Sequence, residues 1–136
     1  MRRSLRDGML AGFAAFALLA SLATAEPPSR LKVAQDLARA HKVWPQGSAW
    51  LKQNQAKTDQ VVVPVLNRCL ADAPDDGEVT AFSVYLRLSK QGRVVEVLTD
   101  IDEELGRCMT LESKDVQLPE APREDFWIQV NLAASL

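Results

Sequence analysis

The chain has 136 residues, 47% of them hydrophobic, and a net charge of −2 that arises from 16 basic and 18 acidic side chains. A chain of this length has room for one small domain. Because acidic and basic residues are interspersed, the sequence lacks the basic patch on which general nucleic-acid binding depends. It also has no polybasic segment for binding a membrane surface.

Residues 1–25 have the pattern of a secretory signal peptide. Arginines at positions 2, 3 and 6 form a basic beginning, residues 9–22 are almost continuously apolar, and Ala23-Thr24-Ala25 supplies the small residues before a cleavage site. We therefore expect cleavage after Ala25 and a periplasmic mature protein without a stable membrane anchor. The alternative is a retained anchor, but the apolar run is shorter than the roughly 20 residues of a membrane-spanning helix.

Residues 26–58 are predicted to form an N-terminal helical segment. Ser29 can cap a helix that runs to about Val43, because mostly apolar side chains recur on one face. These are Leu31, Ala34, Leu37, Ala38 and His41. Trp44-Pro45 then breaks the helix, and residues 50–57, which are polar without a clear period, are interpreted as a turn with a short helix or a linker. Trp44 and Trp50 either pack this segment onto the rest of the protein or form an exposed aromatic surface.

A second part of the chain, residues 59–136, begins with an apolar stretch at helical spacing that ends near Leu70. We expect Pro64 to lie near the first turn of that helix, since a proline deeper inside removes a backbone hydrogen bond. Residues 79–88 then alternate as in a strand. The inward side chains are Thr80, Phe82, Val84, Leu86 and Leu88, and the outward ones are Ser83, Tyr85 and Arg87. Gly92 closes a hairpin, and residues 93–99 form a second strand whose inward face is ambiguous.

The remaining elements are a helix and a third strand. Asp100 or Asp102 caps a helix that runs through Glu112, and a proline-containing connection at residues 118–122 follows. Residues 126–132 alternate, with Phe126, Ile128, Val130 and Leu132 on one face and Trp127, Gln129 and Asn131 on the other. The order α-β-β-α-β predicts an α+β fold, a small three-stranded antiparallel sheet with helices on one face, plus the N-terminal helical segment.

Cys69 and Cys108 are the two cysteines of the chain. In an exported protein such a pair indicates a structural disulfide, which here would tie the helix before the first strand to the helix after the second. The alternative is a reactive thiol pair, but the two residues lie far apart in sequence and lack a Cys-x-x-Cys arrangement.

Other side chains give little support for catalysis or for a bound metal. His41 is the only histidine, so a zinc site lacks a credible ligand set, and we expect His41 to be a helix cap or a packed side chain. Carboxylates cluster at residues 72–78 and 100–104, where a turn and a helix cap explain them better than a calcium loop. Ser83 and Ser113 have no adjacent base or glycine frame. We therefore expect no enzymatic activity, no cofactor and no metal.

The order of these elements resembles a TonB C-terminal-like domain, in the disulfide-bearing form found in bacterial envelope and gliding-associated proteins. The matching pieces are Leu66-Asn67-Arg68-Cys69, residues 82–88, Gly92-Arg93-Val94, Leu105-Gly106-Arg107-Cys108, Leu118-Pro119 and residues 126–132. The resemblance covers roughly residues 60–134 and implies a platform that accepts an extended peptide as an added strand beside the last strand.

Two features depart from TonB itself. The chain has no long proline-rich spacer, and Leu118-Pro119 stands where TonB has an aromatic residue before proline. Energy transduction from the inner membrane is therefore not expected.

Together these patterns predict a periplasmic, non-enzymatic protein-binding module that engages an envelope protein through a sheet edge. Trp127, Gln129 and Asn131 are the candidate partner-binding residues, unless the N-terminal segment covers Trp127. The alternative function is a structural accessory subunit of a larger envelope or secretion assembly, which docks through residues 26–59. An open edge strand also permits pairing with a second copy of the chain, so a homodimer is a further alternative.

Overall fold

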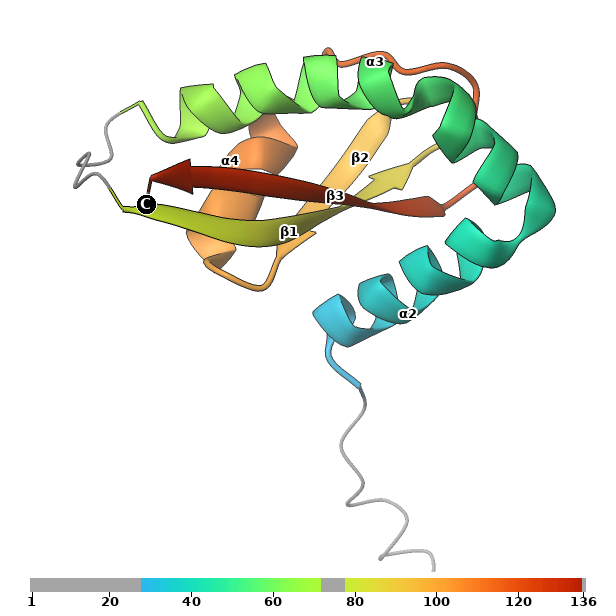
Figure 1. Cartoon of the computed structure of the whole chain (residues 1–136), viewed down its shortest axis with the longest axis horizontal. Coiled ribbons are helices and arrows are strands. Elements are labelled where there is room, and N and C mark those ends of the chain that lie inside the picture. The colour runs from blue at the N-terminus through green and yellow to red at the C-terminus, as the bar shows by residue number, and fades with distance from the viewer. Residues whose placement is uncertain (1–27, 72–77, 136) are drawn as a thin grey trace, which may run out of the picture.

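The computed structural model describes residues 28–71 and 78–135 (Figure 1). This part of the chain forms an α+β fold of three helices and a three-stranded antiparallel sheet. The elements are α2 (Arg30–Val43), α3 (Pro45–Cys69), β1 (Val79–Leu88), β2 (Val94–Thr99), α4 (Glu103–Glu112) and β3 (Phe126–Ser135). The expected signal peptide, residues 1–25, and most of the acidic cluster at residues 72–78 lie outside the described residues.

β1 is the central strand of the sheet, whose order is β2-β1-β3. β3 pairs with β1 along its whole length, from Phe126 opposite Leu88 to Ser135 opposite Val79. β1 and β2 form the predicted hairpin, in which Gly92 has a φ of 86° that favours glycine. Both β2 and β3 are therefore edge strands.

The pairing of β2 contains a β-bulge. Arg87 lies opposite Glu96, whereas the next residue of β1, Leu88, lies opposite Val94. Because of the extra residue, both Val94 and Val97 are buried. A strict alternation of side chains could not produce this pattern, which explains why the inward face of β2 was ambiguous in the sequence.

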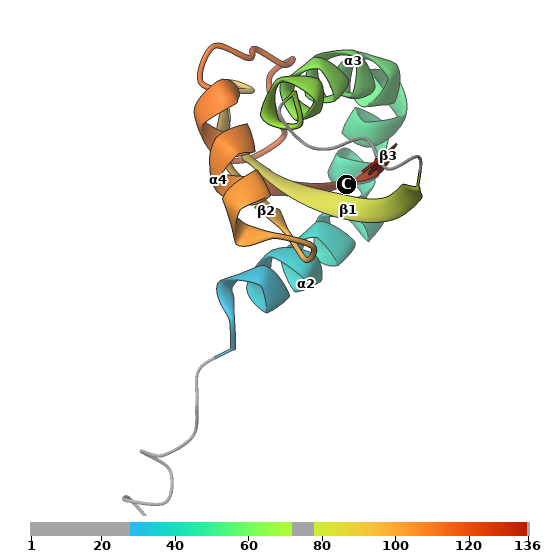
Figure 2. The same ribbon diagram turned by 90° about the vertical axis from the view of Figure 1, so that its left-hand side faces the viewer.

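The helices cover both faces of the sheet, with α3 and α4 on one side and α2 on the other (Figure 2). The main core lies under α3 and α4 and contains the predicted inward side chains of the strands except Thr80, which is exposed near the end of the sheet. Its largest fully buried members include Phe126, Leu86, Leu88, Met109, Leu118 and Ile128. On the opposite face, Ala34 and Ala38 of α2 pack on Tyr85 and Trp127.

α3 is one continuous helix of 25 residues, so the predicted turn or linker at residues 50–57 is wrong. Its buried stripe contains Trp50, Asn54 and Thr58, and the two polar members hid the helical period in the sequence. Their polar groups are satisfied within the helix, because Asn54 donates to the carbonyl of Trp50 over 3.0 Å and Thr58 to that of Asn54 over 2.8 Å. The division of the chain expected between residues 58 and 59 consequently falls inside a helix.

Pro64 lies in the interior of α3 and not near the first turn of a helix, as the sequence led us to expect. Proline at this position removes the hydrogen bond to the carbonyl of Gln60. Pro64 is on the exposed side of α3, where water can bind a freed carbonyl group. The packing of Val62, Val65 and Leu66 in the core then holds the helix together through the proline.

The junction between α2 and α3 is a sharp corner at Trp44, the residue between the two helices, with Pro45 as the first residue of α3. Gly47 lies directly against the end of α2, and a Cβ atom there would overlap the carbonyl oxygen of His41. Only glycine therefore permits this approach of the two helices.

Asp102 caps α4, as one of the two sequence alternatives predicted, and accepts a hydrogen bond from the backbone of Glu104 over 3.0 Å. The disulfide joins Cys69 at the end of α3 to Cys108 in α4, with a Cα–Cα distance of 5.8 Å. The predicted clasp between these two helices is thus present. Of the helices in residues 28–71 and 78–135, none has the length and hydropathy to span a membrane.

Candidate functional site

The edge of β2 is closed by the chain itself. The hydroxyl of Thr110 in α4 accepts from the main-chain N–H of Val97 over 3.0 Å and lies 3.3 Å from the carbonyl of the same residue. Gly106 permits this approach of α4, since a Cβ atom there would come within 3.2 Å of the Val97 carbonyl oxygen. Farther along this edge, Arg93 pairs with Gln117. An added strand would therefore find few free main-chain N–H and C=O groups on β2.

The edge of β3 is open over much of its length. In an antiparallel pair, alternate residues direct both main-chain groups away from the neighbouring strand. The N–H of Trp127 points away from β1, because it donates to Nδ1 of His41 over 2.9 Å. By the same alternation, Gln129, Asn131 and Ala133 direct their N–H and C=O groups outward. Within the described parts of the chain these main-chain groups have no hydrogen-bond partner.

A groove of about 320 Å³ runs along this open edge. β3 forms its floor, and α2 and α3, which diverge from the corner at Trp44 on either side of the strand, form its walls (Figure 1). The lining residues are Ala38 and Lys42 of α2, Leu51, Gln55, Thr58 and Asp59 of α3, and Ile128, Gln129, Val130 and Asn131 of β3. The unpaired main-chain groups of Gln129 and Asn131 thus lie at the bottom of a cleft.

The side chain of Trp127 does not belong to the accessible surface. It is only 4% exposed and lies beneath α2, so the alternative in which the N-terminal segment covers it is the correct one. Ala34 and Ala38 are small enough for α2 to lie close to the indole. On the other side, the guanidinium of Arg87 is 6.0 Å from the ring centroid. Trp127 therefore offers no accessible side chain to the candidate site.

Gln129 and Asn131 are exposed, as predicted, and form a small polar network with Ser83 of β1. Ser83 donates to Oδ1 of Asn131 over 2.8 Å, and the amide of Gln129 donates to the same oxygen over 3.0 Å. This network holds both side chains on the α2 side of the sheet and leaves the main-chain edge between them accessible.

Trp50 and Trp44 have different roles. Trp50 is buried in the main core, contacts the ring of Phe126 edge-on at 5.4 Å and donates to the carbonyl of Glu120 over 2.9 Å. Trp44 is half-buried at the corner, with its ring 6.5 Å from that of His41. The two tryptophans therefore serve packing and form no shared exposed aromatic surface.

His41 closes the first position of the β3 edge. It is buried at the end of α2, stacks on Phe126 with ring centroids 5.3 Å apart, and accepts from Trp127. Burial lowers the pKa of His41, and the positive charge of Arg123 lowers it further, against the opposing effect of the Trp127 carbonyl. The hydrogen bond from the N–H of Trp127 requires an unprotonated Nδ1, and the lowered pKa favours the same neutral form of the ring. Its helix-end position was evident in the sequence, whereas its contact with β3 depends on long-range packing.

A charged network fixes the beginning of α2 to the sheet. Glu96 of β2 accepts hydrogen bonds from Arg30 of α2 and, over 3.2 Å, from Arg87. Arg87 also donates to Asp125 over 2.8 Å. The bonded guanidinium of Arg30 lowers the pKa of Glu96 more than burial raises it.

A second, larger groove of about 660 Å³ lies between the beginning of α2, β2 and α4. Leu31, Leu98 and Leu111 line it together with the ion pair of Arg30 and Glu96. Thr110 already bonds to the main-chain groups of Val97 here. The part of β2 in this groove is therefore not free to pair with an added strand.

Chemistry-bearing side chains do not converge in the described chain. Within residues 28–71 and 78–135, no group of three or more histidines, cysteines or carboxylates is placed to hold a metal ion. Ser83 belongs to the polar network on the sheet, and Ser113 is buried at the end of α4.

No family model, curated protein or solved structure matches the chain.

Proposed function

We propose that this protein is a non-enzymatic binding module that accepts an extended segment of an envelope protein as an additional strand on the edge of β3. The observation that carries the proposal is the row of outward main-chain groups at Gln129, Asn131 and Ala133, of which the first two lie at the floor of a groove between two helices. The groove exposes main-chain N–H and C=O groups with which an added strand can pair. No other residue of the described chain bonds to these groups.

Strand addition is physically suited to this site. The main-chain hydrogen bonds of an added strand supply affinity with little demand on sequence, and side chains that alternate between the two walls supply specificity. An open edge also exposes a protein to unwanted pairing. β2 is protected from such pairing by Thr110, and the absence of an equivalent device on residues 129–133 of β3 favours a functional use of that edge.

The proposed location is the periplasm, with the signal peptide removed after Ala25. This part of the proposal rests on the pattern of residues 1–25 and on the disulfide between Cys69 and Cys108, which is typical of an oxidising compartment. The resemblance to TonB C-terminal-like domains points to the same edge, since it implies an added strand beside the last strand.

An accessory subunit that docks through residues 26–59 is the second candidate. One observation favours it: α2 exposes Val33, Leu37 and Val43, which are 41%, 37% and 76% exposed. The inward side chains of the same segment are already used in packing against the sheet. In this candidate the exposed apolar side chains on the outer surface of α2 would take part in docking.

Hydrogen exchange on the mature chain tests the proposal. Peptides that bind are selected from a displayed library of short random sequences, and amide exchange is measured by NMR with and without them. We expect the amides of Gln129, Asn131 and Ala133 to become protected, because their N–H groups donate to the added strand. Binding should be abolished by Asn131→Pro, which removes one of these donors, and weakened far less by Asn131→Ala, which keeps the main-chain N–H and removes only the side-chain amide.

Other outcomes distinguish the alternatives. If peptide binding is lost in Val33→Ser or Leu37→Ser but kept in Asn131→Pro, the peptide binds to the outer surface of α2 and not to the edge of β3. Protection of the same three amides that depends on protein concentration, without any peptide, would identify a second copy of the chain as the occupant.

A further inference from the structure

The groove along β3 is polar and charged in a way that restricts which segment fits it. His41 occupies the main chain of Trp127, so an added strand begins its pairing at Gln129. From there, the side chains of the added strand alternate between the α2 wall and the α3 wall. The two walls carry different side chains.

The α3 wall is mixed, with one apolar and three polar lining residues. Leu51 belongs to this wall, and Ile128 and Val130 of β3 point to the same side, into the main core. Gln55, Thr58 and Asp59 complete it. Side chains of the partner on this side therefore meet a mixed surface, in which Asp59 is the one carboxylate.

The α2 wall is polar. Lys42 lies on it, and Gln129 and Asn131 point to the same side of the sheet. Ala38 is the small residue that leaves space between them and the helix. Side chains of the partner on this side meet amide groups and one ammonium group.

Lys42 and Asp59 are the charged residues among those that line the groove. Both are exposed, and neither forms a salt bridge with another residue of the described chain. Lys42 follows His41 directly and so lies near the beginning of β3. Asp59 lies farther along, because α3 begins beside Phe126 and its rise of about 1.5 Å per residue carries it along the strand.

We infer that the groove selects an extended segment with an acidic residue that faces Lys42 and a basic residue that faces Asp59, separated by an odd number of positions. The odd spacing follows from the geometry, since the two charges lie on opposite walls and only residues of opposite parity in a strand face opposite sides. This inference rests on the proposed strand addition and specifies its partner.

Charge reversal with a displayed library of short random peptides tests the inference. Peptides are selected in parallel against the mature chain and against its Lys42→Glu and Asp59→Lys variants. We expect acidic residues to be enriched at the α2-facing positions for the natural chain and basic residues for Lys42→Glu. Asp59→Lys should likewise replace the basic residue of selected peptides by an acidic one.

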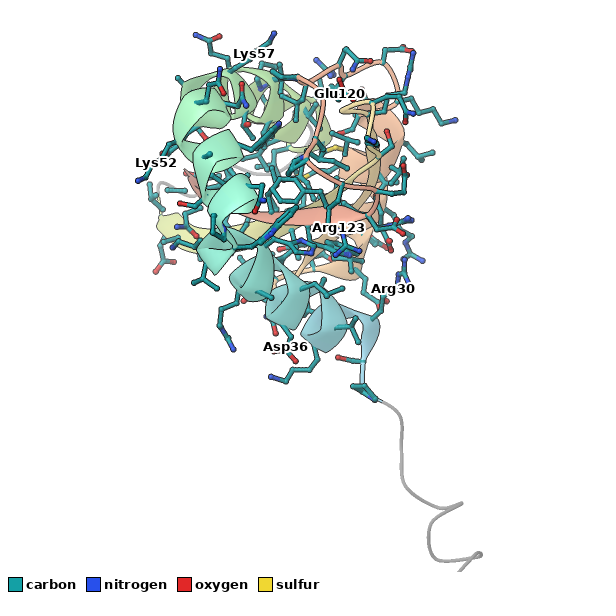
Figure 3. All side chains as sticks on the ribbon, turned by 90° about the vertical axis from the view of Figure 1, so that its right-hand side faces the viewer. Arg30, Asp36, Lys52, Lys57, Glu120 and Arg123 are labelled. Carbon is teal, nitrogen blue, oxygen red and sulfur yellow. A yellow bond between two sulfur atoms is a disulfide. The ribbon has the colours of Figure 1, made fainter. Side chains whose placement is uncertain are left out.

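The binding of one selected peptide gives the quantitative test. Each reversal should weaken binding about three- to tenfold, as expected for a solvent-exposed charge pair that becomes a repulsion. Reversing the corresponding charge in the peptide should restore it. Matched controls are Lys57→Glu, at a lysine that Figure 3 shows on the outer side of α3, and Asp115→Lys, at an exposed residue outside the groove. Neither control should change the affinity beyond twofold.

The outcomes separate this inference from the proposed function. If the selected sequences and the affinities are the same for the natural chain and the reversed variants, while Asn131→Pro still abolishes binding, strand addition stands and the charge pattern is wrong. Enriched acidic and basic residues at an even spacing would also overturn the inference. If no selected peptide depends on the β3 edge, the proposed function itself fails.

Discussion

Nδ1 of His41 accepts a hydrogen bond of 2.9 Å from the main-chain N–H of Trp127, so a side chain of α2 takes the place that a neighbouring strand would have beside β3. This contact ends the open edge at one defined position. It also attaches the end of α2 to the sheet at a point where the small side chains Ala34 and Ala38 provide little contact area.

Acidification should weaken the fold through His41. Because burial lowers the pKa of His41 below its ordinary value of 6.5, the unfolded chain takes up the proton first as the pH falls. The contribution of neutral His41 to the free energy of unfolding is therefore fully present above about pH 6.5. It is lost as the pH falls through the pKa of His41 in the folded state. Urea denaturation at about pH 7.5 and about pH 5.5 measures the difference, and the single histidine of the chain makes it assignable.

Two variants of His41 separate the effect of its titration on stability from the effect of its hydrogen bond to Trp127. His41→Asn keeps an acceptor for the N–H of Trp127 but does not titrate, so its stability should depend much less on pH in this range. His41→Phe leaves the buried N–H without a partner and should cost about 1–3 kcal/mol at neutral pH. A natural chain whose stability is the same at both pH values would contradict the buried, neutral imidazole.

The disulfide should supply a large share of the stability. Cys69 and Cys108 close a loop with a sequence separation of 39, for which chain entropy predicts a contribution of about 4 kcal/mol. We expect the double variant Cys69→Ser/Cys108→Ser to lose about this amount in urea denaturation. The reduced natural chain should behave like the double variant, and an oxidised natural chain no more stable than the reduced one would exclude the disulfide as a stabilising link.

Removing the hydroxyl of Thr110 should expose the edge of β2 to solvent. Thr110→Val keeps the shape of the side chain but leaves the main chain of Val97 without its partner, at an expected cost of about 1–3 kcal/mol. Thr110→Ser retains the hydroxyl and is the matched control. Hydrogen exchange should report faster exchange of the Val97 amide in Thr110→Val alone, and equal exchange in both variants would show that the hydroxyl does not close this edge.

The ion network of Glu96 should hold the beginning of α2. Glu96→Gln weakens its bonds to Arg30 and Arg87, and we expect a loss of about 1 kcal/mol with faster amide exchange in α2. Because the pKa of Glu96 lies below its ordinary value of 4.5, this contribution is present above about pH 4.5 and is lost as the pH falls through the lower value. Asp36→Asn, at the exposed pair with Lys32, serves as the control and should change stability by less than about 0.5 kcal/mol.

Local sequence patterns predicted those elements whose side chains alternate or are capped in the usual way. The bounds of β1, the cap of α4, which was predicted as Asp100 or Asp102, and the inward face of β3 belong to this group. The continuity of α3 was missed because its buried stripe includes Asn54 and Thr58, whose polar groups suggest an exposed segment until their bonds within the helix are known.

The candidate site could be predicted only in part. Gln129 and Asn131 are exposed as the alternation of β3 indicates, whereas the burial of Trp127 depends on α2, an element more than eighty residues away in the sequence. The groove depends on the strand order and on the corner between α2 and α3. Both are products of long-range packing that no local pattern records.

The corner at Trp44 has a consequence for the design of this groove. The two walls belong to helices that meet there, and Gly47 cannot accept even one additional carbon without displacing the end of α2. The spacing of the walls is therefore determined at a position remote from the open residues of β3. Changes at the corner alone would therefore alter the width of the groove and leave the main chain of β3 as it is.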